Sequence, residues 1–297
     1  MQVHDVDLKL LRIFVAIVEC GGLSAAESRL NIGRSTISAH LSDLEVRLGI
    51  KLCKRGRSGF ELTESGRVTY QASLELLQHC DAFASTVASA KQELAGRVSI
   101  AVIDTLVSDP RCDIAGVISA LKAKSNHIQF DINVCEAREV ETSVVNGRSL
   151  VGIGVSRHHL RGLDYHPLHN ETNYLYCGVG HPLFDSTADK MPKLLQNAEV
   201  ITSNYMRDKE MRNDDLNYQN TATAYHDEGI AHLILSGKFI GYLPEHYASH
   251  WVEKGLFKAI LPQKYSYQIP VMLITSKSHT ATPLASALIA EIKQCHL

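Results

Sequence analysis

A slim polar turn opens the segment GRSTISAHLSDLEVRLG, which begins at residue 33. Its polar side chains are Arg34, Ser35, Thr36, Ser38 and His40. An arginine can pair bidentately with guanine O6 and N7, and hydroxyl groups can bond to phosphates or base edges. The turn is also compatible with a solvated helix end. Its residue types favour contacts in the major groove of double-stranded DNA.

A run of basic side chains follows this segment. Between residues 47 and 57 there are five bases and no acid: Arg47, Lys51, Lys54, Arg55 and Arg57. The whole chain has a formal net charge of −2, so any attraction to phosphate must be local. We expect Lys54, Arg55 and Arg57 to contact DNA.

The surrounding pattern predicts the elements that would position these residues. Residues 7–22 read as a helix with Asp7 as its N-cap, and residues 24–30 as a short helix. After a three-residue break, Ile37, Leu41, Leu44 and Leu48 recur at gaps of four, three and four. This order is a helix-turn-helix over about Ser24–Asp43. The runs IKLCKR and GFELT, joined by GRSG, predict a small hairpin, or wing.

A long helix is expected next, capped by Thr63 and ended by Gly96. Its apolar residues are spaced close to a heptad, which indicates a seam with a partner helix. The alternative is a surface helix packed on its own domain, but 30 helical residues span about 45 Å, too long for one small domain. The predicted dimer seam comprises Tyr70, Leu74, Leu77, Phe83, Val87 and Leu94.

From residue 97 onward, strand-like apolar runs alternate with helical patterns. This alternation indicates an α/β domain with a mainly parallel sheet. A length of 297 residues also favours two or more domains.

Composition and motifs exclude several classes of protein. No apolar run is long enough for a membrane span, and the first residues lack the basic region of a secretory signal, so we expect a cytoplasmic protein. The seven cysteines form no CxxC pair, and the fifteen histidines form no HExxH motif. We therefore expect no catalytic residues, no metal and no cofactor.

The segment SAAESRLNIGRSTISAHLSDLEVRLGIKLCKRGRSGFELTESG closely resembles the N-terminal domain of LysR-type transcriptional regulators. Later motifs fall where that family has similar ones: Glu136-Ala137-Arg138, His181-Pro182-Leu183, and Gly237 followed by Tyr242-Leu243-Pro244. The family often has Gln-Pro where this chain has Arg34-Ser35, so its base preference is expected to differ.

The resemblance implies a bacterial regulator with three parts. These are a winged helix-turn-helix domain (1–66), a linker and dimerisation helix (67–96) and a periplasmic-binding-protein-like effector domain (97–297). Lobe one of that domain would comprise about 97–166 and 267–297, and lobe two about 167–266. Such proteins are homo-oligomers, usually tetramers, that bind an interrupted dyad in promoter DNA. A small metabolite of unknown identity binds between the lobes and alters recruitment of RNA polymerase.

By the same resemblance, six residues are candidates for effector binding. They are Asp104, Thr105, Arg138, Thr202, Ser203 and Asp227. A guanidinium at Arg138 would suit a carboxylate, and helix N-termini would offer amides to anions. The alternative for Arg138 is a surface ion pair with Glu136 or Glu141.

Two other functions stay open at this point. Cys112, Cys135 and Cys177 would form a thiol redox sensor if they were exposed and electropositive, although buried structural cysteines are the alternative. Arg55-Gly56-Arg57 also slightly resembles a loop of biotin ligases, in which a winged helix is fused to an enzyme domain. No downstream motif supports such an active site.

Overall fold

The computed structural model describes residues 3–56, 59–90, 93–156, 159–187, 189–203, 216, 222–276 and 282–295. Its internal contacts divide the chain into two units. The first comprises Met1–Gly96 with Asn146–Arg148, and the second comprises Arg97–Val145 with Ser149–Leu297. Each unit is described below by itself. Among the described helices, none combines the length and apolar character that crossing a membrane requires.

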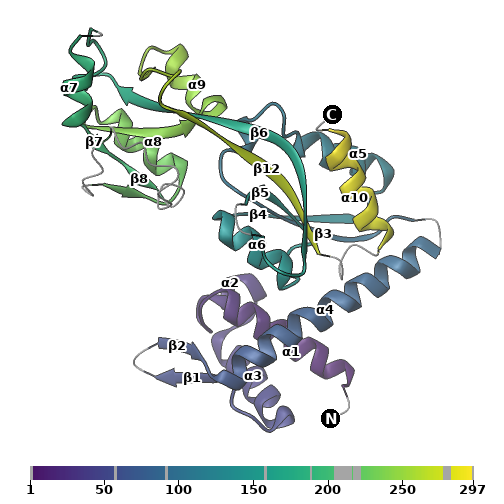
Figure 1. The fold of residues 1–297 in the computed structure, drawn as a ribbon. Coiled ribbons are helices and arrows are strands. Elements are labelled where there is room, and N and C mark those ends of the chain that lie inside the picture. The colour runs from purple at the N-terminus through teal and green to yellow at the C-terminus, as the bar shows by residue number, and fades with distance from the viewer. Residues whose placement is uncertain are drawn as a thin grey trace. The chain divides into compact units, whose positions relative to one another are not determined.

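The first unit is a helix-turn-helix with a hairpin and a long helix (Figure 1). Its elements are α1 (Asp5–Glu19), α2 (Ala26–Leu30), α3 (Arg34–Leu48), β1 (Cys53–Gly56), β2 (Gly59–Leu62) and α4 (Glu64–Ala90). The two strands pair antiparallel, with Cys53 opposite Leu62. The predicted wing is therefore present, and Cys53 is buried on its inner side.

One core holds the first unit together. Phe14 and Ile17 of α1 and Ile37, Leu41 and Leu44 of α3 are almost fully buried in it. The apolar spacing that predicted α3 is thus the face that packs. Burying each such side chain contributes about 1.5–3 kcal/mol relative to exposure.

Two helix ends test the sequence-based capping predictions. The prediction for Thr63 is confirmed, because its Oγ1 accepts a hydrogen bond from Gly66 N at 2.8 Å in the first turn of α4. The prediction for Asp7 is wrong, because α1 begins at Asp5 with His4 as its N-cap. Asp7 lies at the third helical position and its carboxylate accepts a hydrogen bond from His4 N at 2.8 Å.

The second unit is built on one eight-stranded sheet with the order β4-β3-β5-β12-β6-β10-β7, and β11 pairs with β6. Its strands are β3 (Gly96–Val102), β4 (Ile128–Val134), β5 (Val151–Val155), β6 (Leu163–Gly178), β7 (Glu199–Val200), β10 (Phe239–Pro244), β11 (Phe257–Ala259) and β12 (Ser266–Ser276). A separate parallel pair consists of β8 (Thr202–Ser203) and β9 (Thr223–Ala224).

The prediction of a mainly parallel sheet is wrong in the middle of this sheet. The pairs β3–β5 and β10–β7 are parallel, but β5, β12, β6 and β10 pair antiparallel. Strand β12 pairs along its whole length with β6, from Ser266 opposite Tyr174 to Ser276 opposite Leu163. The predicted lobe boundaries near 166 and 266 therefore fall within or beside this long pair, which runs through both lobes (Figure 1).

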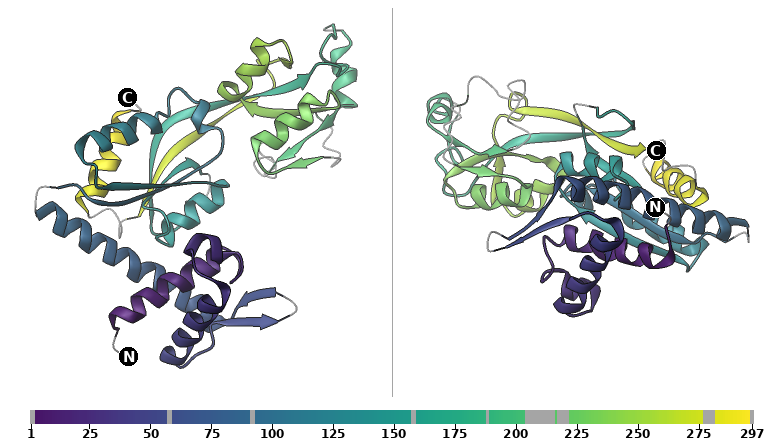
Figure 2. Two further views of the ribbon diagram at one scale, coloured as in Figure 1. Left: turned by 180° about the vertical axis from the view of Figure 1, so that it is seen from behind. Right: turned by 90° about the horizontal axis from the view of Figure 1, so that it is seen from below.

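Helices and one short 3-10 turn cover the sheet. They are η1 (Leu106–Ser108), α5 (Ile114–Lys124), α6 (Ala137–Val145), α7 (Met191–Gln196), α8 (Asp227–Leu235), α9 (Glu245–Glu253) and α10 (Pro283–Gln294). Figures 1 and 2 show α5 and α10 side by side, so the C-terminal helix completes lobe one. Lobe two has its own cores around Leu175, Ile240 and Leu243.

Candidate DNA-binding face and effector cavity

The first turn of α3 lies at the surface while the other side of the helix is anchored. Arg34, Ser35 and Thr36 are exposed, and Ser38 and His40 are half-buried. Arg34 has no ion-pair partner among the described residues. Because the buried leucines fix the helix, the polar turn is presented on a rigid element rather than on a loop.

The N-terminus of α3 is open. Its N-cap is Gly33 in an extended conformation, and no side chain of the described residues caps the helix. A Cβ added at Gly33 would meet no atom within 4 Å. The unpaired amides and the helix dipole at such an end favour phosphate, so the turn can hold DNA backbone as well as read bases.

Glu45 connects the far end of α3 to the wing. Its side chain is buried, and Oε1 accepts hydrogen bonds from Leu52 N at 2.8 Å and Cys53 N at 3.4 Å. Its Oε2 accepts a bond from Lys51 Nζ at 2.7 Å. Burial opposes ionisation, but Lys51 and the two amides outweigh it and lower the pKa of Glu45. The carboxylate therefore fixes where the wing begins.

Asp7 is a second buried carboxylate, and it pairs with Arg47, another base of the run. Arg47 donates to Asp7 with both Nε and Nη2, the latter to Oδ2 at 3.0 Å. The hydrogen bond from Arg47, followed by that from the His4 amide, lowers the pKa of Asp7 to about 2. This pair joins α1 to the end of α3 across 40 residues of sequence, so Arg47 acts in the fold.

The remaining bases lie on the wing. Lys54 is exposed on β1. Arg55 lies on the same strand, and its side chain falls outside what the structure describes, as does the whole of Arg57. Among the bases of the run whose side chains the structure describes, Arg47, Lys51 and Lys54 are exposed, and the first two are already paired with carboxylates.

The second unit contains a cavity between its two lobes. Its volume is about 20 Å³, about that of one water molecule. Its walls come from lobe one, from the β6–β12 pair and from lobe two. The lining residues are Ile103, Val155, Glu171, Asn173, Ser203, Asp227, Ile230, Tyr242, Tyr267 and Ile269.

Asp104 of lobe one holds the start of α8 in lobe two. Its Oδ2 accepts a hydrogen bond from Asp227 N at 2.8 Å and lies 3.6 Å from His226 Nδ1. Asp227 is 9% exposed as a residue, and its carboxyl receives a long hydrogen bond, 3.5 Å, from Thr105 Oγ1. Burial, then the charges of Asp104 and Glu171, raise the pKa of Asp227 well above its usual range.

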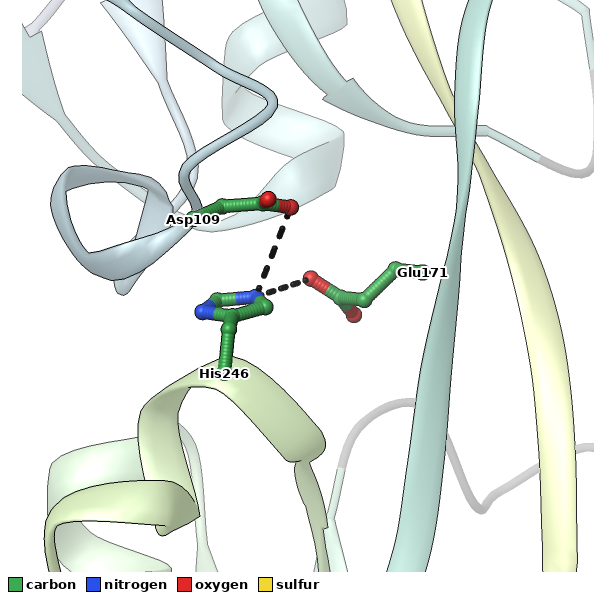
Figure 3. A group of neighbouring side chains, drawn as sticks. All are labelled: Asp109, Glu171 and His246. Atoms are coloured by element: carbon green, nitrogen blue, oxygen red, sulfur yellow. Dashed lines mark hydrogen bonds and ion pairs between the residues drawn. The ribbon is translucent and has the colours of Figure 1, made fainter.

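Next to the cavity, His246 of α9 lies between two carboxylates (Figure 3). Its Nε2 is 3.2 Å from Glu171 Oε2 and 3.7 Å from Asp109 Oδ2. Three such groups within 4.8 Å have the composition of a metal site.

The partners of Asp109 favour another interpretation. Arg111 donates to both of its oxygens, with Nε to Oδ1 and Nη2 to Oδ2, each at 2.9 Å. His169 Nε2 lies 2.9 Å from Oδ2. Burial opposes ionisation of Asp109, but Arg111 outweighs it, and the pKa falls to about 2. With both oxygens already bonded, we interpret the cluster as a charged contact between the lobes.

Comparisons with known proteins follow the same division of the chain. The model for "Bacterial regulatory helix-turn-helix protein, lysR family" matches residues 8–67, and the model for "LysR substrate binding domain" matches residues 91–295. This chain is a LysR-type transcriptional regulator. The transcriptional activator BauR from Pseudomonas aeruginosa is 42% identical over 279 residues, which cover 93% of this chain and 91% of BauR.

Solved LysR-type regulators share the fold of this one. CbnR complexed with its target DNA has a TM-score of 0.63 at 16% identity, with 97% of this chain and 99% of CbnR covered. LysG from Corynebacterium glutamicum, solved with bound effector Arg, has a TM-score of 0.58 at 17% identity, with 97% of each chain covered. The two family models establish the helix-turn-helix and effector-binding domains expected from the sequence, and the solved structures share their fold.

The predicted effector residues of this LysR-type regulator divide into three groups. Ser203 and Asp227 line the cavity. Asp104 and Thr105 bond to Asp227 from lobe one, and Thr202 is buried beside Ser203 on β8. Arg138 is exposed in the first turn of α6 and is not among the lining residues.

Sequence reasoning missed four lining residues with polar groups, Glu171, Asn173, Tyr242 and Tyr267, as well as the four aliphatic ones. Tyr242 belongs to the Tyr242-Leu243-Pro244 motif, and the position of that motif in the chain does not indicate a role for the tyrosine side chain. Glu171 and Asn173 alternate on β6, the spacing at which two side chains share a face of a strand. That alternation is the signal available in the sequence.

The predicted dimer seam of the LysR-type regulator is divided along α4. Leu74 is buried in its own unit, and Tyr70 packs edge-on against Phe14 at 6.4 Å between ring centroids. Phe83 is 72% exposed and Val87 44% exposed. Leu77 is half-buried, and Leu94 lies after the helix, which ends at Ala90.

The cysteines that would sense redox state are poorly suited to that role. Cys112, Cys135 and Cys177 are all buried. Burial raises the pKa of the Cys112 thiol to about 12 and that of Cys177 to about 11. Because the thiolate is the reactive form, these environments favour structural cysteines.

Proposed function

We propose that this regulator reads an interrupted dyad in promoter DNA with the first turn of α3, using Arg34, Ser35, Thr36, Ser38 and His40. The observation that carries the proposal is the exposed, uncapped turn on a helix whose other face is buried. Lys54, Arg55 and Arg57 of the wing would hold the flanking phosphates. A twofold oligomer would place two such helices on the two half-sites.

We also propose that a small metabolite binds in the cavity between the lobes and changes the state of the bound regulator. The cavity fits such a role because its walls come from both lobes, so that a ligand there would alter their contact. The solved structure of LysG with bound effector Arg supports small-molecule binding by a protein of this fold. The signal would then pass to RNA polymerase at the promoter.

Self-association through α4 completes the proposal. Phe83 and Val87 are large apolar side chains left exposed on a helix of 27 residues. Single exposed apolar residues are common, but two at one-turn spacing on a long helix suit a partner helix. A dimer of this kind, or a tetramer built from it, would provide the symmetry that a dyad requires.

The test begins by selecting operator fragments from random DNA with the purified full-length protein. Binding is then measured by fluorescence anisotropy over a range of salt. Arg34→Ala is expected to weaken binding by about 1–3 kcal/mol per half-site and to relax preference at one base position. Arg34→Lys keeps the charge but loses the bidentate fork, so it should recover affinity without recovering preference.

Arg161→Ala is the matched control, because it removes one exposed arginine from the second unit. Lys54→Ala should reduce the slope of log affinity against log salt by about one and leave base preference unchanged. If the Arg34 variants select the same operator as the parent protein, the reading role of α3 is wrong.

A further inference from the structure

We propose that the effector carries an ammonium group, which binds in the cavity against the carboxylates of Asp227 and Glu171. This inference rests on the proposed function, in which the cavity is the effector site. It adds the chemical class of the ligand, a small organic amine.

The charged groups around the cavity are mostly acidic. Among the lining residues that the structure describes, Glu171 and Asp227 are the charged ones, and none is a lysine or an arginine. Asp104 lies behind Asp227 from lobe one. On the basic side, His246 of α9 faces Glu171, and His226 faces Asp104 from the edge of α8. Arg111 lies near Glu171, but its guanidinium already donates to both oxygens of Asp109 and to Asn170 O, so among the described residues a ligand anion in the cavity would mainly meet carboxylates.

The usual anion site of such a cavity is already filled. A helix N-terminus attracts negative charge, and α8 begins at the cavity wall with Asp227. Asp104 Oδ2 accepts the hydrogen bond from the first amide of this helix at 2.8 Å. The protein's own carboxylate therefore occupies the position that a carboxylate effector would need.

Asp227 is a buried acid with an unfilled side. From the described residues its carboxyl receives one side-chain hydrogen bond, the 3.5 Å contact from Thr105 Oγ1, which is at the limit for such a bond. Burial, followed by the charges of Asp104 and Glu171, raises the pKa of the group, which favours its protonated form. A cation placed in the cavity would stabilise the ionised form in place of that proton.

The remaining walls suit the body of a small amine. Tyr242 and Tyr267 lie side by side with ring centroids 5.3 Å apart, and aromatic faces attract ammonium groups. The cavity has the volume of about one water molecule, so the lobes must separate to admit a carbon chain, which would then lie against isoleucines from both lobes. Asn173 and Ser203 add neutral polar groups on the same walls.

In the proposed binding step an amine displaces a proton from Asp227. The ligand arrives as R–NH₃⁺ and the Asp227 carboxyl as COOH. The complex contains R–NH₃⁺ beside COO⁻, and one proton passes to the buffer. An incoming carboxylate would instead bind with no proton released, or with one taken up. The direction of proton transfer therefore distinguishes the two ligand classes.

The experiment is titration calorimetry on the full-length protein at pH 7, in two buffers with different ionisation enthalpies. The probes are straight-chain amines of two to six carbons, simple amino acids, and the matched carboxylates and amides. We expect an amine to bind and to release protons to the buffer. Asp227→Asn should abolish the release and weaken binding at least tenfold. Asp185→Asn, an exposed acid of the same lobe, should do neither.

A second variant protects the test against misfolding. If Asp227→Asn fails to fold, Glu171→Gln must weaken the amine at least tenfold while leaving the far-UV circular dichroism unchanged. Binding of carboxylates in place of amines would overturn the inference and keep the cavity as the effector site, provided that Ile230→Trp, which fills the cavity, abolishes that binding. If no probe binds, the ammonium inference is wrong. If Ile230→Trp also binds DNA and responds to cell extract as the parent does, the proposed effector site is wrong as well.

Discussion

Replacing Glu45 with alanine is expected to detach the wing from α3. The change leaves the Leu52 amide, which donates to Glu45 Oε1 at 2.8 Å, buried and without its acceptor, and it removes the weaker contact to Cys53 N at 3.4 Å. An orphaned buried amide costs about 1–3 kcal/mol, so the pair should cost about 2–4 kcal/mol. That is a large share of the stability of a small domain.

Hydrogen exchange read by mass spectrometry suits this prediction because it reports locally. The single tryptophan, Trp251, lies in the other unit, so fluorescence would miss the event. The peptide containing Leu52 and Cys53 should lose protection in Glu45→Ala. Glu45→Gln keeps a carbonyl acceptor for both amides and should lose less, about 0–1 kcal/mol, because Lys51 is mostly exposed.

The pH dependence of the same contact has a definite sign. The pKa of Glu45 is lowered in the folded chain, so the ionised form is favoured by folding. Its contribution is complete above the usual value of 4.5 and disappears as pH falls through the lowered value. Equal protection of the Leu52 peptide in the parent and Glu45→Ala, at pH 7 and at pH 4, would refute this account of how the wing is held.

Three further changes test other parts of the molecule. Phe83→Asp should weaken self-association in sedimentation velocity, while Val107→Asp, which changes a fully exposed apolar residue of the other unit, should not. An unchanged oligomer of Phe83→Asp would show that Phe83 is not part of the interface. Asp109 has a pKa of about 2, so its contribution to stability should be lost as pH falls from about 4 towards 2, and Asp109→Asn should flatten the acid part of the Tm profile. Gly178→Ala would bring a Cβ to 2.1 Å from Ile234 O and should cost at least about 1–3 kcal/mol in calorimetry; a Tm within error of the parent's would show that β6 and α8 can separate cheaply.

The first unit could be predicted from the sequence because its determinants are local. The apolar spacing predicted α3, the GRSG turn predicted the wing, and Thr63 predicted the start of α4. Gly66 is another local determinant. A Cβ there would lie 2.0 Å from Leu52 O, so α4 can start beside Leu52 only with glycine at this position. Asp7 was mistaken for a cap because its partner, Arg47, is 40 residues away and no local pattern indicates it.

The cavity could be predicted only in part, because its walls combine segments more than 100 residues apart. Asp227 and Ser203 were found through their place beside motifs of the family. Asp104 was also predicted, but for a different role. We expected a ligand anion at a helix N-terminus, whereas the Asp104 carboxylate itself accepts the hydrogen bond from the first amide of α8. The antiparallel pairs in the centre of the sheet could not be predicted, because a strand-like run of residues does not indicate the direction in which that strand pairs with its neighbours.

The long pair of β6 and β12 makes lobe two an insertion with two neighbouring junctions. The chain enters the lobe along one strand and leaves along the other, and Asn170 lies opposite Pro270 where they pair. A segment whose ends lie side by side in a regular ladder can be exchanged without altering the path of the rest of the chain. Recombination at these two positions would thus give a regulator a new ligand wall while keeping its operator, which makes sensing and DNA recognition separable in evolution and in engineering.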